Sequence, residues 1–508
     1  MPGEIRDPIH GDVFLQDIEL QIIDTPQFQR LRWLSELPTA QFVYPGATHS
    51  RFSHCIGVME LASRIFRNLK SLTNKSLNGR QEDHRNLRIA ALLHDIEAPP
   101  YYPVFQEHFL LKDDLRSLRR EYVRAICESV SHQYNQEVDA DIIVGILNDE
   151  SEFRYLSQII DCEVGANRLD YLMRDAFYCG VNYGKIDPRI LYEFYHDGGE
   201  IVLLKEALPL VDAVFNSLFQ MKINVYDHRI SKLVTRMVYD MIEEGLRKHL
   251  CKTTDLLRLN DGEFLEEMER INHGSALLLK NRKLLKTASI LDAVSLRDPE
   301  MPRYFETFRK KESVEKEIRD ETSVPSVIVE FSTLRHPPST PIEARVNARR
   351  VRLSDVPLLR KWYDKEPYRQ WKMFVFCESH EREKVHEECE KLLGPLEIGR
   401  EGEERKIIPS LKEMYDRLDS EMAGQSVRSS IKSKVIELPK HEFLTLRALV
   451  DVGPCTAQEI SRKTKRERST ESLLLNRLAE SGFAEKQRQG KKIYFKPIAP
   501  VIGALKEL

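Results

Sequence analysis

The sequence predicts a mainly α-helical protein with more than one domain, on three observations. First, the chain of 508 residues is too long for one ordinary hydrophobic core. Second, apolar residues recur at helical spacing up to about residue 330, and a proline-rich break follows at 334–345. Third, residues 438–508 have the pattern of three short helices and a basic hairpin. We therefore expect a helical core, a small α+β middle unit and a C-terminal winged helix-turn-helix.

The composition is that of a globular protein with no membrane segment. Hydrophobic residues make up 41% of the chain and charged residues 31%, and no run approaches the roughly 18 apolar residues that a bilayer requires. The N-terminal stretch MPGEIRDPIHGD lacks the features of a secretory signal. The eight cysteines form no CxxC pair, which argues against a zinc ribbon or a disulfide framework. The sequence predicts a cytoplasmic location and no membrane partner.

The helical domain is expected over residues 1–333. Two stretches carry the strongest periodicity, CIGVMELASRIFRNL at 55–69 and NLRIAALLHDI at 86–96. Apolar residues at i, i+3, i+4 and i+7 place one face of each helix in a core. These two helices are expected to lie side by side.

The middle unit is expected over residues 345–420. WKMFVFC at 371–377 alternates like a strand, and a charged helix follows that begins after Ser379 and stops at Gly394. A polar stretch at 421–437 is expected to be a linker.

The C-terminal domain, residues 438–508, is the basic part of the chain. From His441 onward it holds 13 Lys and Arg against 8 Asp and Glu. Such charges suit DNA phosphates, so the pattern predicts binding to double-stranded DNA. A winged helix that serves dimerisation or covers a neighbouring domain is the alternative. The expected DNA-binding residues are Lys465, Arg466, Arg468, Lys491 and Lys492.

Metal-capable side chains emerge from the two strongest helices. His94 and Asp95 end the apolar segment IAALLHD, and His54 begins the helix that could lie beside it. Imidazole and carboxylate groups together suit a divalent transition metal. A His-Asp pair alone is also what a helix end or a satisfied core histidine produces.

The surrounding sequence resembles a known family. Residues 7–58, the segment LLHD at 92–95 and NRLDYLMRDAFYCGVNYG at 167–184 resemble the HD superfamily of metal-dependent phosphohydrolases over roughly residues 5–330. The branch it is most similar to is that of the deoxynucleoside triphosphate triphosphohydrolases, including the sterile-alpha-motif members. The resemblance implies an all-helical core that holds a divalent transition metal. Its ligand positions correspond to His54, His94, Asp95 and Asn167.

Two departures from the family affect catalysis. The family has an aspartate where this chain has Asn167, so the site loses a charged ligand. Asp170 could replace it only if the helix rotated. Where the family places histidines after its His-Asp pair, this chain has Glu97 and then the segment APPYYP, and Arg119 stands near another histidine position. The catalytic acid and base therefore remain unassigned.

The resemblance also suggests a nucleotide pocket. Arg51 matches a phosphate-binding arginine, and Tyr171, Asp175 and Tyr226 match groups beside the sugar and in the pocket. Arginine suits phosphate because its planar fork donates two parallel hydrogen bonds. A structural ion pair is the alternative for Arg51, as it is for Arg174.

Further positions bear on binding. Glu36 and Leu218 replace a glutamine and an arginine of the family, and a carboxylate in that place would repel a triphosphate. Asp24, Gln29 and Arg32 fall where the sterile-alpha-motif members bind a regulatory guanine nucleotide.

These observations lead to a functional prediction with alternatives. We expect an HD-domain, metal-dependent phosphohydrolase with a partly degenerate active site that acts on nucleotides, above all (deoxy)nucleoside triphosphates. The alternative is a catalytically inactive HD nucleotide sensor or a transcription regulator acting through the winged helix, and a third reading is a structural scaffold. The family's tendency to assemble predicts a homo-oligomer.

Overall fold

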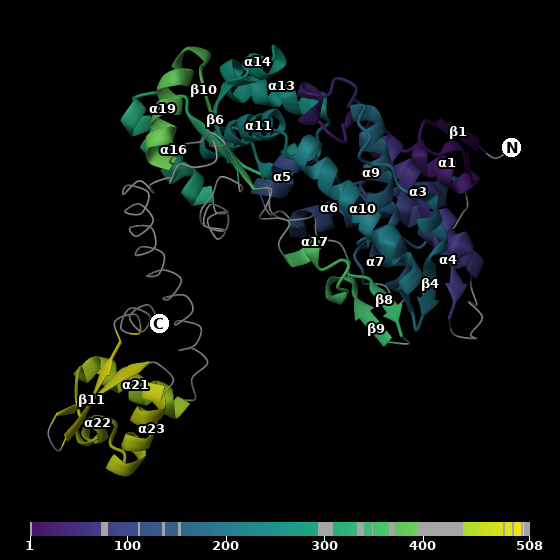
Figure 1. Cartoon of the computed structure of the whole chain (residues 1–508). Coiled ribbons are helices and arrows are strands. Elements are labelled where there is room, and N and C mark those ends of the chain that lie inside the picture. Colours follow the sequence, from purple (N-terminus) through teal and green to yellow (C-terminus); the bar gives the residue numbers. More distant parts are fainter. Residues whose placement is uncertain are drawn as a thin grey trace. The chain divides into compact units, whose positions relative to one another are not determined.

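The protein is described by a computed structural model covering residues 3–72, 80–109, 112–134, 138–150, 154–292, 308–332, 340–347, 349–364, 371–393, 440–480, 483–489, 492–498 and 501. The chain divides into two compact units, one up to Cys389 and one that holds the C-terminal domain. Both are drawn in Figure 1. The predicted mainly helical class is confirmed. Among the described residues, no helix combines the length and the apolar character needed to span a bilayer.

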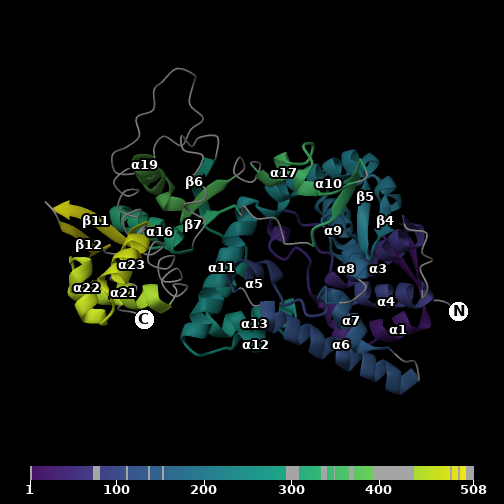
Figure 2. The same cartoon turned by 90° about the horizontal axis from the view of Figure 1, so that it is seen from below.

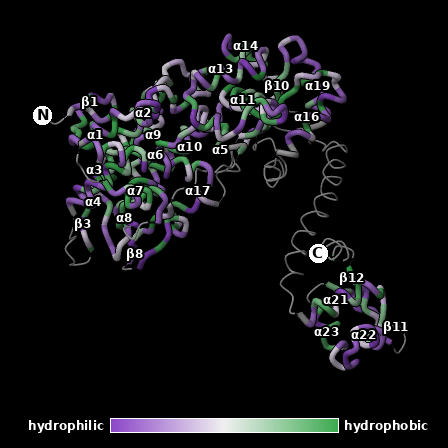
Figure 3. The backbone as a smooth tube through the Cα atoms, turned by 180° about the vertical axis from the view of Figure 1, so that it is seen from behind, coloured by the Kyte–Doolittle hydropathy of each residue, from purple (hydrophilic) through white to green (hydrophobic). Residues whose placement is uncertain are grey.

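The helical core is arranged around one long helix, α3. This helix, Arg51–Asn68, is buried on nearly every face and packs against α4, Arg80–Leu92, and α9, Ala166–Cys179. Figure 3 shows hydrophobic stretches gathered in this interior, among α3, α7 and α8. The two helices expected to be neighbours are α3 and α4, and they are. The other helices of this core are α1 Asp17–Ile23, α2 Pro26–Gln29, η1 Arg30–Trp33, η2 Ala40–Phe42, α6 Lys112–Tyr134, α7 Ala140–Leu147, α8 Arg154–Ile160, η3 Pro188–Tyr192, η4 Lys205–Ala207, α10 Leu208–Met221 and the π-helical turn η5 Lys222–Tyr226. Helix α5, Tyr102–His108, packs instead against α11, Arg229–Arg247.

A short hairpin precedes the core. Strand β1, Gly3–Asp7, pairs antiparallel with β2, Gly11–Leu15. Val13 and Leu15 point into the core, whereas Phe14 between them is exposed, as period-2 alternation demands. The hairpin turn, at residues 8–10, carries His10.

A second hydrophobic cluster forms around α11, Arg229–Arg247, which contacts α13, α14 and β7. Figure 2 shows α11 beside α13. The sheet beside it has the order β6-β10-β7, and both pairings are antiparallel. The strand predicted at 371–377 is β10, the central strand. Its partners both precede the proline-rich segment, so the expected middle unit does not stand alone. The elements are α12 Thr253–Leu256, α13 Asp261–Ile271, α14 His273–Lys280, β6 Lys286–Asp292, α16 Phe308–Thr322, β7 Ile328–Phe331, β10 Lys372–Cys377, η7 Ser379–Glu381 and α19 Arg382–Leu393.

The remaining strands of the middle segment also join the helical region. Strands β8, Glu343–Val346, and β9, Arg349–Arg352, extend a sheet of order β3-β4-β5-β8-β9. They are followed by η6 Leu353–Asp355 and α17 Lys361–Asp364. The earlier strands are β3 Lys70–Ser71, β4 Phe194–Asp197 and β5 Glu200–Leu204. The predicted linker at 421–437 lies outside the described residues.

The C-terminal unit is a small helical domain with a hairpin, as predicted. Helices α21 Lys440–Val452, α22 Ala457–Thr464 and α23 Arg468–Glu480 pack on the hairpin of β11 Ala484–Gln489 and β12 Lys492–Pro497. A capping box between Thr456 and Glu459 begins α22, and Lys465 ends it in the left-handed conformation (φ 56°). The order helix, helix, turn, helix and hairpin is that of a winged helix.

Candidate functional site

The predicted metal ligands come together between two helices. His54 lies in the first turn of α3, and His94 and Asp95 follow the last residues of α4. Their ligand atoms all lie within 4.8 Å of one another. Both histidines are buried, with 1% and 6% of their surface exposed. Three of the four predicted ligands therefore form one cluster.

The two imidazoles are held in the orientation that a metal requires. The Nδ1–H of His54 donates to Asp170 Oδ2 at 2.7 Å, and the Nδ1–H of His94 donates to the Ala91 carbonyl at 2.9 Å. Each ring therefore presents its Nε2 to the cluster, and the two Nε2 atoms lie 3.2 Å apart. Nitrogens that share one tetrahedral ion at about 2.1 Å stand roughly 3.4 Å apart. The donor set and its supporting hydrogen bonds fit a divalent metal.

Asn167 stands at the edge of this cluster. Its Oδ1 lies 3.1 Å from His54 Nε2, so the amide oxygen faces the same point as the imidazoles. Asp170 binds the opposite nitrogen of His54, and its carboxylate supports the ligand from behind. The helix is not rotated to bring Asp170 to the metal face. The fourth position is therefore occupied by an uncharged oxygen.

The cluster's charges control its protonation. Burial would lower the pKa of His54, but the carboxylates of Glu36 and Asp170 outweigh it and raise that pKa to about 9. Burial lowers the pKa of His94 to about 4. Burial would also raise the pKa of Asp95, yet the charges of His94 and Arg51 bring it well below its usual range. Without a metal, the proton on His54 Nε2 faces an unprotonated His94 Nε2.

Arg51 occupies the position predicted for phosphate binding, but it is already paired. Its guanidinium forms an ion pair with Asp95 and lies 3.4 Å from Glu36 Oε2. It also stacks over the Tyr102 ring at 4.8 Å, and only 4% of it is exposed. The alternative of a structural ion pair therefore describes Arg51 in this conformation. A phosphate would have to compete with Glu36 for this arginine.

An ion pair stands near His94, where the family has catalytic histidines. Glu97 and Arg119 bind each other, and Arg119 Nη2 lies 3.5 Å from the His94 carbonyl oxygen. Burial raises the pKa of Glu97, although Arg119 opposes the change. Tyr101, at φ 48°, is in the left-handed region, and its amide donates to Asp261 Oδ1. This ion pair offers no imidazole for proton transfer.

The predicted sugar-side residues also meet. Tyr226 donates its hydroxyl hydrogen to Asp175 Oδ2 at 2.7 Å, and the Tyr171 and Tyr226 rings lie 6.4 Å apart, edge to face. His49 Nε2 binds the other oxygen of Asp175 at 2.7 Å. Arg174 is not part of this group. It is fully buried and pairs with Asp170 and Asp7, which is the structural alternative.

Gln29 and Arg32, which the resemblance places at a regulatory nucleotide site, contact each other. Arg32 Nε donates to Gln29 Oε1 at 2.8 Å, and the Arg32 guanidinium stacks on the Phe52 ring at 3.5 Å. Asp24 caps the end of α1 and is exposed. These contacts secure the segment to α3.

The basic residues of the winged helix divide into two groups. Lys465, Arg468 and Lys492 are exposed, as binding to DNA requires. Arg466 is instead turned inward, and its Nη1 lies 3.3 Å from the buried carboxylate of Glu471. It also donates to the Thr445 hydroxyl and the His441 carbonyl. Arg466 thus holds the turn before α23, and Lys491 lies outside the described residues.

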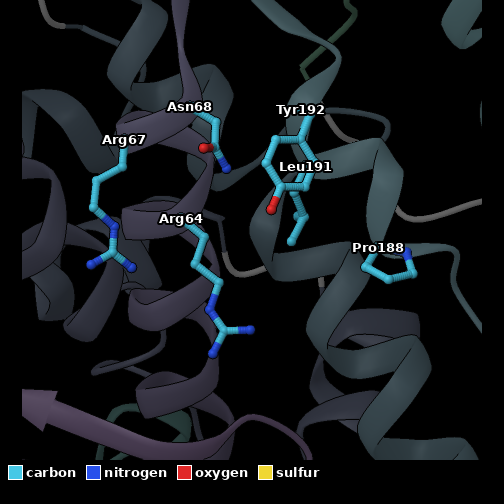
Figure 4. A pocket seen from close by; sticks show the side chains of 6 residues that line it. All are labelled: Arg64, Arg67, Asn68, Pro188, Leu191 and Tyr192. Atoms are coloured by element: carbon cyan, nitrogen blue, oxygen red, sulfur yellow. The ribbon is translucent and has the colours of Figure 1, made fainter.

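An open depression lies elsewhere on the helical region, between the end of α3 and η3. It has a volume of about 280 Å³ and is lined by Arg64, Arg67, Asn68, Pro188, Leu191 and Tyr192 (Figure 4). Glu60 lies 2.7 Å from Arg64 and 3.5 Å from Arg67, so its charge is shared between the two arginines. None of the lining residues belongs to the metal cluster or the sugar-side group.

Some residues of the site were not singled out from the sequence. These are His10 and Asp7, which form a buried layer with Asp170 behind His54. Asp170 and Glu36 were named from the sequence, but the contacts of Asp170 with His54 and of Glu36 with Arg51 were not. The stretch DPIHG was part of the resemblance, but its role was not assigned. A polar Asp-Pro-x-His turn directly before a buried strand was the available signal.

Comparison with known proteins agrees with the geometry. Residues 51–171 match the model of the HD domain, 186–404 that of an HD associated region, and 433–500 that of the sugar-specific transcriptional regulator TrmB. The associated region spans the proline-rich segment, in agreement with the two sheets whose strands come from both sides of that segment.

Curated relatives match up to about half of the chain. An uncharacterized protein of Methanocaldococcus jannaschii is 30% identical over 262 residues, which is 51% of this chain and 53% of the relative. A deoxynucleoside triphosphate triphosphohydrolase SAMHD1 homolog of Dictyostelium discoideum is 28% identical over 303 residues, 56% of this chain and 57% of that protein. Bovine SAMHD1 is 42% identical over 106 residues, 21% and 18% of the two chains. The chain therefore spans about half the length of the first two of these relatives.

Solved structures support the fold. A hypothetical protein from Aquifex aeolicus is similar with a TM-score of 0.56 and 23% identity, covering 76% of this chain and 100% of that one. A phosphohydrolase from Bacteroides thetaiotaomicron gives a TM-score of 0.57 and 18% identity, covering 75% and 100%. The solved structures share the fold, and the family models show that the chain carries an HD domain, an HD associated region and a C-terminal winged helix of the TrmB type.

Proposed function

We propose that this protein is a divalent-metal-dependent phosphohydrolase that acts on nucleotides. The observation that carries the proposal is the convergence of His54 Nε2 and His94 Nε2 at 3.2 Å, with Asp95 beside them and each Nδ1 tied to an acceptor. Such a pair of facing lone pairs is unfavourable unless a cation or a proton lies between them. A proton on His54 Nε2 fills this place in the metal-free protein, and the Asp95 carboxylate and the Asn167 amide oxygen beside it favour a metal cation.

The chain's residues have separate roles in this proposal. His54, His94 and Asp95 hold the metal, and the amide oxygen of Asn167 faces it. When bound, the ion supplies Lewis acidity and lowers the pKa of a coordinated water. Arg51, beside Asp95, receives a phosphate oxygen once Glu36 gives way. No protein base is required to activate the water in such a site, which is consistent with the Glu97–Arg119 pair in place of histidines.

Deoxynucleoside triphosphates are the substrates to test first. The Dictyostelium and bovine relatives are named as deoxynucleoside triphosphate triphosphohydrolases. The joined side chains of Asp175, Tyr226 and Tyr171 offer hydroxyl and carboxylate oxygens of the kind that bind a sugar. Glu36 disfavours a triphosphate by its charge, so nucleoside mono- and diphosphates belong in the same panel.

Metal content and product release test the proposal. Protein purified without chelator is analysed for bound metals and then incubated with the nucleotide panel, while phosphate, pyrophosphate and triphosphate are measured. We expect near one equivalent of metal and release of one of these products. His94→Ala should abolish both, whereas His84→Ala, a change on α4 where the ring stacks on Phe66, should retain them. A metal-bearing protein that leaves every nucleotide intact would refute hydrolysis and favour a nucleotide sensor.

A second function, binding of double-stranded DNA, is favoured by the winged helix. The TrmB match and the exposed Lys465, Arg468 and Lys492 support it. We expect the affinity to fall steeply between 50 and 200 mM salt, on the order of tenfold or more, because phosphate contacts release counterions. Lys465→Ala with Arg468→Ala should weaken binding, and Asp451→Ala, an exposed change on α21, is the control. Binding that survives truncation at about residue 436 would contradict this role.

A further inference from the structure

The turn of the N-terminal hairpin reaches the rear of the metal cluster. His10, which follows β1 and precedes β2, approaches Asp170 with its Nε2 2.5 Å from Oδ1. The other oxygen of Asp170 accepts the Nδ1–H of His54 at 2.7 Å. The three side chains are at most 3% exposed. One carboxylate therefore joins the hairpin to a metal-ligating ring.

Arg174 completes this layer. Its Nε donates to Asp170 Oδ2 at 2.8 Å and its Nη2 to Oδ1 at 2.9 Å, so each oxygen of Asp170 accepts from the arginine and from one histidine. Its Nη1 donates to Asp7 Oδ2 at 2.8 Å. Asp7 Oδ1 in turn accepts the backbone N–H groups of Ile9 and His10. The hairpin turn is thus fixed by the same charges that fix Asp170.

The space for this layer is created by a glycine. A Cβ at Gly57, in the second turn of α3, would stand 2.0 Å from Asp170 Oδ1 and 2.3 Å from Arg174 Nη2. Any side chain there would push the carboxylate away from His54. Helix α3 therefore supplies a ligand through His54 and the room for its support through Gly57, one turn apart.

We propose that His10 is a positioning residue for the metal, holding Asp170, and through it the His54 ring, with Nε2 toward His94. The inference rests on the proposed function. Asp170 has four donors, and His10 is the only one of them on the hairpin. Without His10, Oδ1 keeps a single partner and the carboxylate can turn about its bond to the helix. Loss of such a supporting partner lowers metal affinity by about 10–100-fold.

Asp7 and Arg174 would still fasten the hairpin if His10 were lost, which separates positioning from mere attachment. A residue that only fastened the hairpin would affect the stability of the metal-free protein and leave its affinity for metal unchanged. A positioning residue affects the affinity of protein that remains folded. The two roles therefore predict different measurements.

The test compares Co²⁺ binding by the full-length wild type, His10→Ala, His10→Gln and Arg6→Ala after removal of bound metal. Arg6 lies on the same hairpin in an exposed ion pair with Asp12 and serves as the matched control. We expect His10→Ala to bind Co²⁺ about 10–100-fold more weakly and to alter the visible Co²⁺ spectrum. His10→Gln should recover most of the affinity, because its amide N–H can donate to Asp170. Arg6→Ala should equal the wild type.

Thermal unfolding of the metal-free proteins accompanies the titrations, so that only folded protein is compared. Equal Co²⁺ affinity and spectrum in wild type and folded His10→Ala would overturn the positioning role and leave the hydrolase proposal standing. A wild type that binds no Co²⁺ would overturn both, so the two failures are distinguishable.

Discussion

The two halves of the candidate site, the metal cluster and the proposed phosphate-binding arginine, differ in whether their groups are free to bind a ligand. On the metal side, the Nδ1 atoms of both imidazoles are hydrogen-bonded and their Nε2 atoms face the cluster. The residue in the fourth ligand position, Asn167, is uncharged. On the phosphate side, the available cation, Arg51, is already neutralised by Asp95 and Glu36. The arrangement thus keeps the geometry for binding a metal cation, while the acidic neighbours of Arg51 oppose the binding of a phosphate. We therefore expect metal binding and phosphate binding to respond to different substitutions.

The metal side should break most severely at Gly57. Gly57→Ala places a methyl group against the buried ion pair of Asp170 and Arg174. We expect the free energy of unfolding to fall by about 3 kcal/mol, since overpacking and a disturbed buried pair act together. Urea unfolding followed by circular dichroism measures the change.

Gly274→Ala, in the first turn of α14, is the control for that change. Its new Cβ would meet only Asn272 Oδ1 at 3.8 Å, an ordinary contact. We expect it to stay within about 0.5 kcal/mol of the wild type. Equal stability of the two alanine variants would contradict the tight packing behind the metal.

The metal side should be strengthened at position 167. Asn167→Asp places a carboxylate oxygen near His54 Nε2, where the amide oxygen now lies at 3.1 Å. We expect affinity for a divalent metal to rise by about 10-fold or more, because a charged ligand replaces a neutral one. Competition with a chelating dye reports the affinity. Asn281→Asp, an exposed change at the end of α14, adds the same charge far from the cluster and should leave affinity unaltered.

The pH dependence of metal uptake probes the same side. The carboxylates near His54 raise its pKa to about 9, so below that pH a proton must leave His54 before the metal binds. Metal affinity should therefore increase with pH, by about tenfold per unit between pH 6.5 and 8.5. Titrations with Co²⁺ across this range measure the slope. A flat profile would mean that His54 is unprotonated in the metal-free protein.

On the phosphate side, a substitution at Glu36 should strengthen the binding of phosphate to Arg51, with a smaller effect than the changes on the metal side. Glu36→Gln removes the carboxylate 3.4 Å from Arg51 and keeps the shape of the side chain. We expect deoxynucleoside triphosphates to bind about 3–10-fold more tightly, because one like charge is gone and Arg51 loses a competitor. Calorimetry with a triphosphate measures binding, and Glu206→Gln, an exposed change, is the control. Unaltered affinity would show that Asp95 alone restrains Arg51.

The sequence was sufficient for the fold and for the clustering of His54, His94 and Asp95, for a physical reason. His54, His94 and Asp95 lie at the ends of two strongly periodic helices, and helical geometry together with a family resemblance places such residues reliably. The state of Arg51 was left between phosphate binding and an ion pair, because that choice depends on the distant Glu36 and Tyr102. Arg466 was expected at DNA, but Glu471, five residues on, turns it inward.

Sequence reasoning was weakest where contacts cross long stretches of chain. The proline-rich segment at 334–345 predicts a domain boundary, yet β10 beyond it pairs with β6 and β7 before it. The support of His54 by His10 likewise joins residues through Asp170, which is 160 positions from His10. The local periodicity of the sequence does not indicate which distant residues pair with one another.

The position of β10 has a consequence for how the protein is made. Strands β6 and β7 cannot be joined until the segment up to Cys377 has emerged from the ribosome, since β10 lies between them. Until then the nascent chain exposes two strands whose backbone N–H and C=O groups lack their partner strand, a condition that favours aggregation and the binding of chaperones. A chain truncated at the proline-rich segment would lack β10, so β6 and β7 would never gain their shared partner strand.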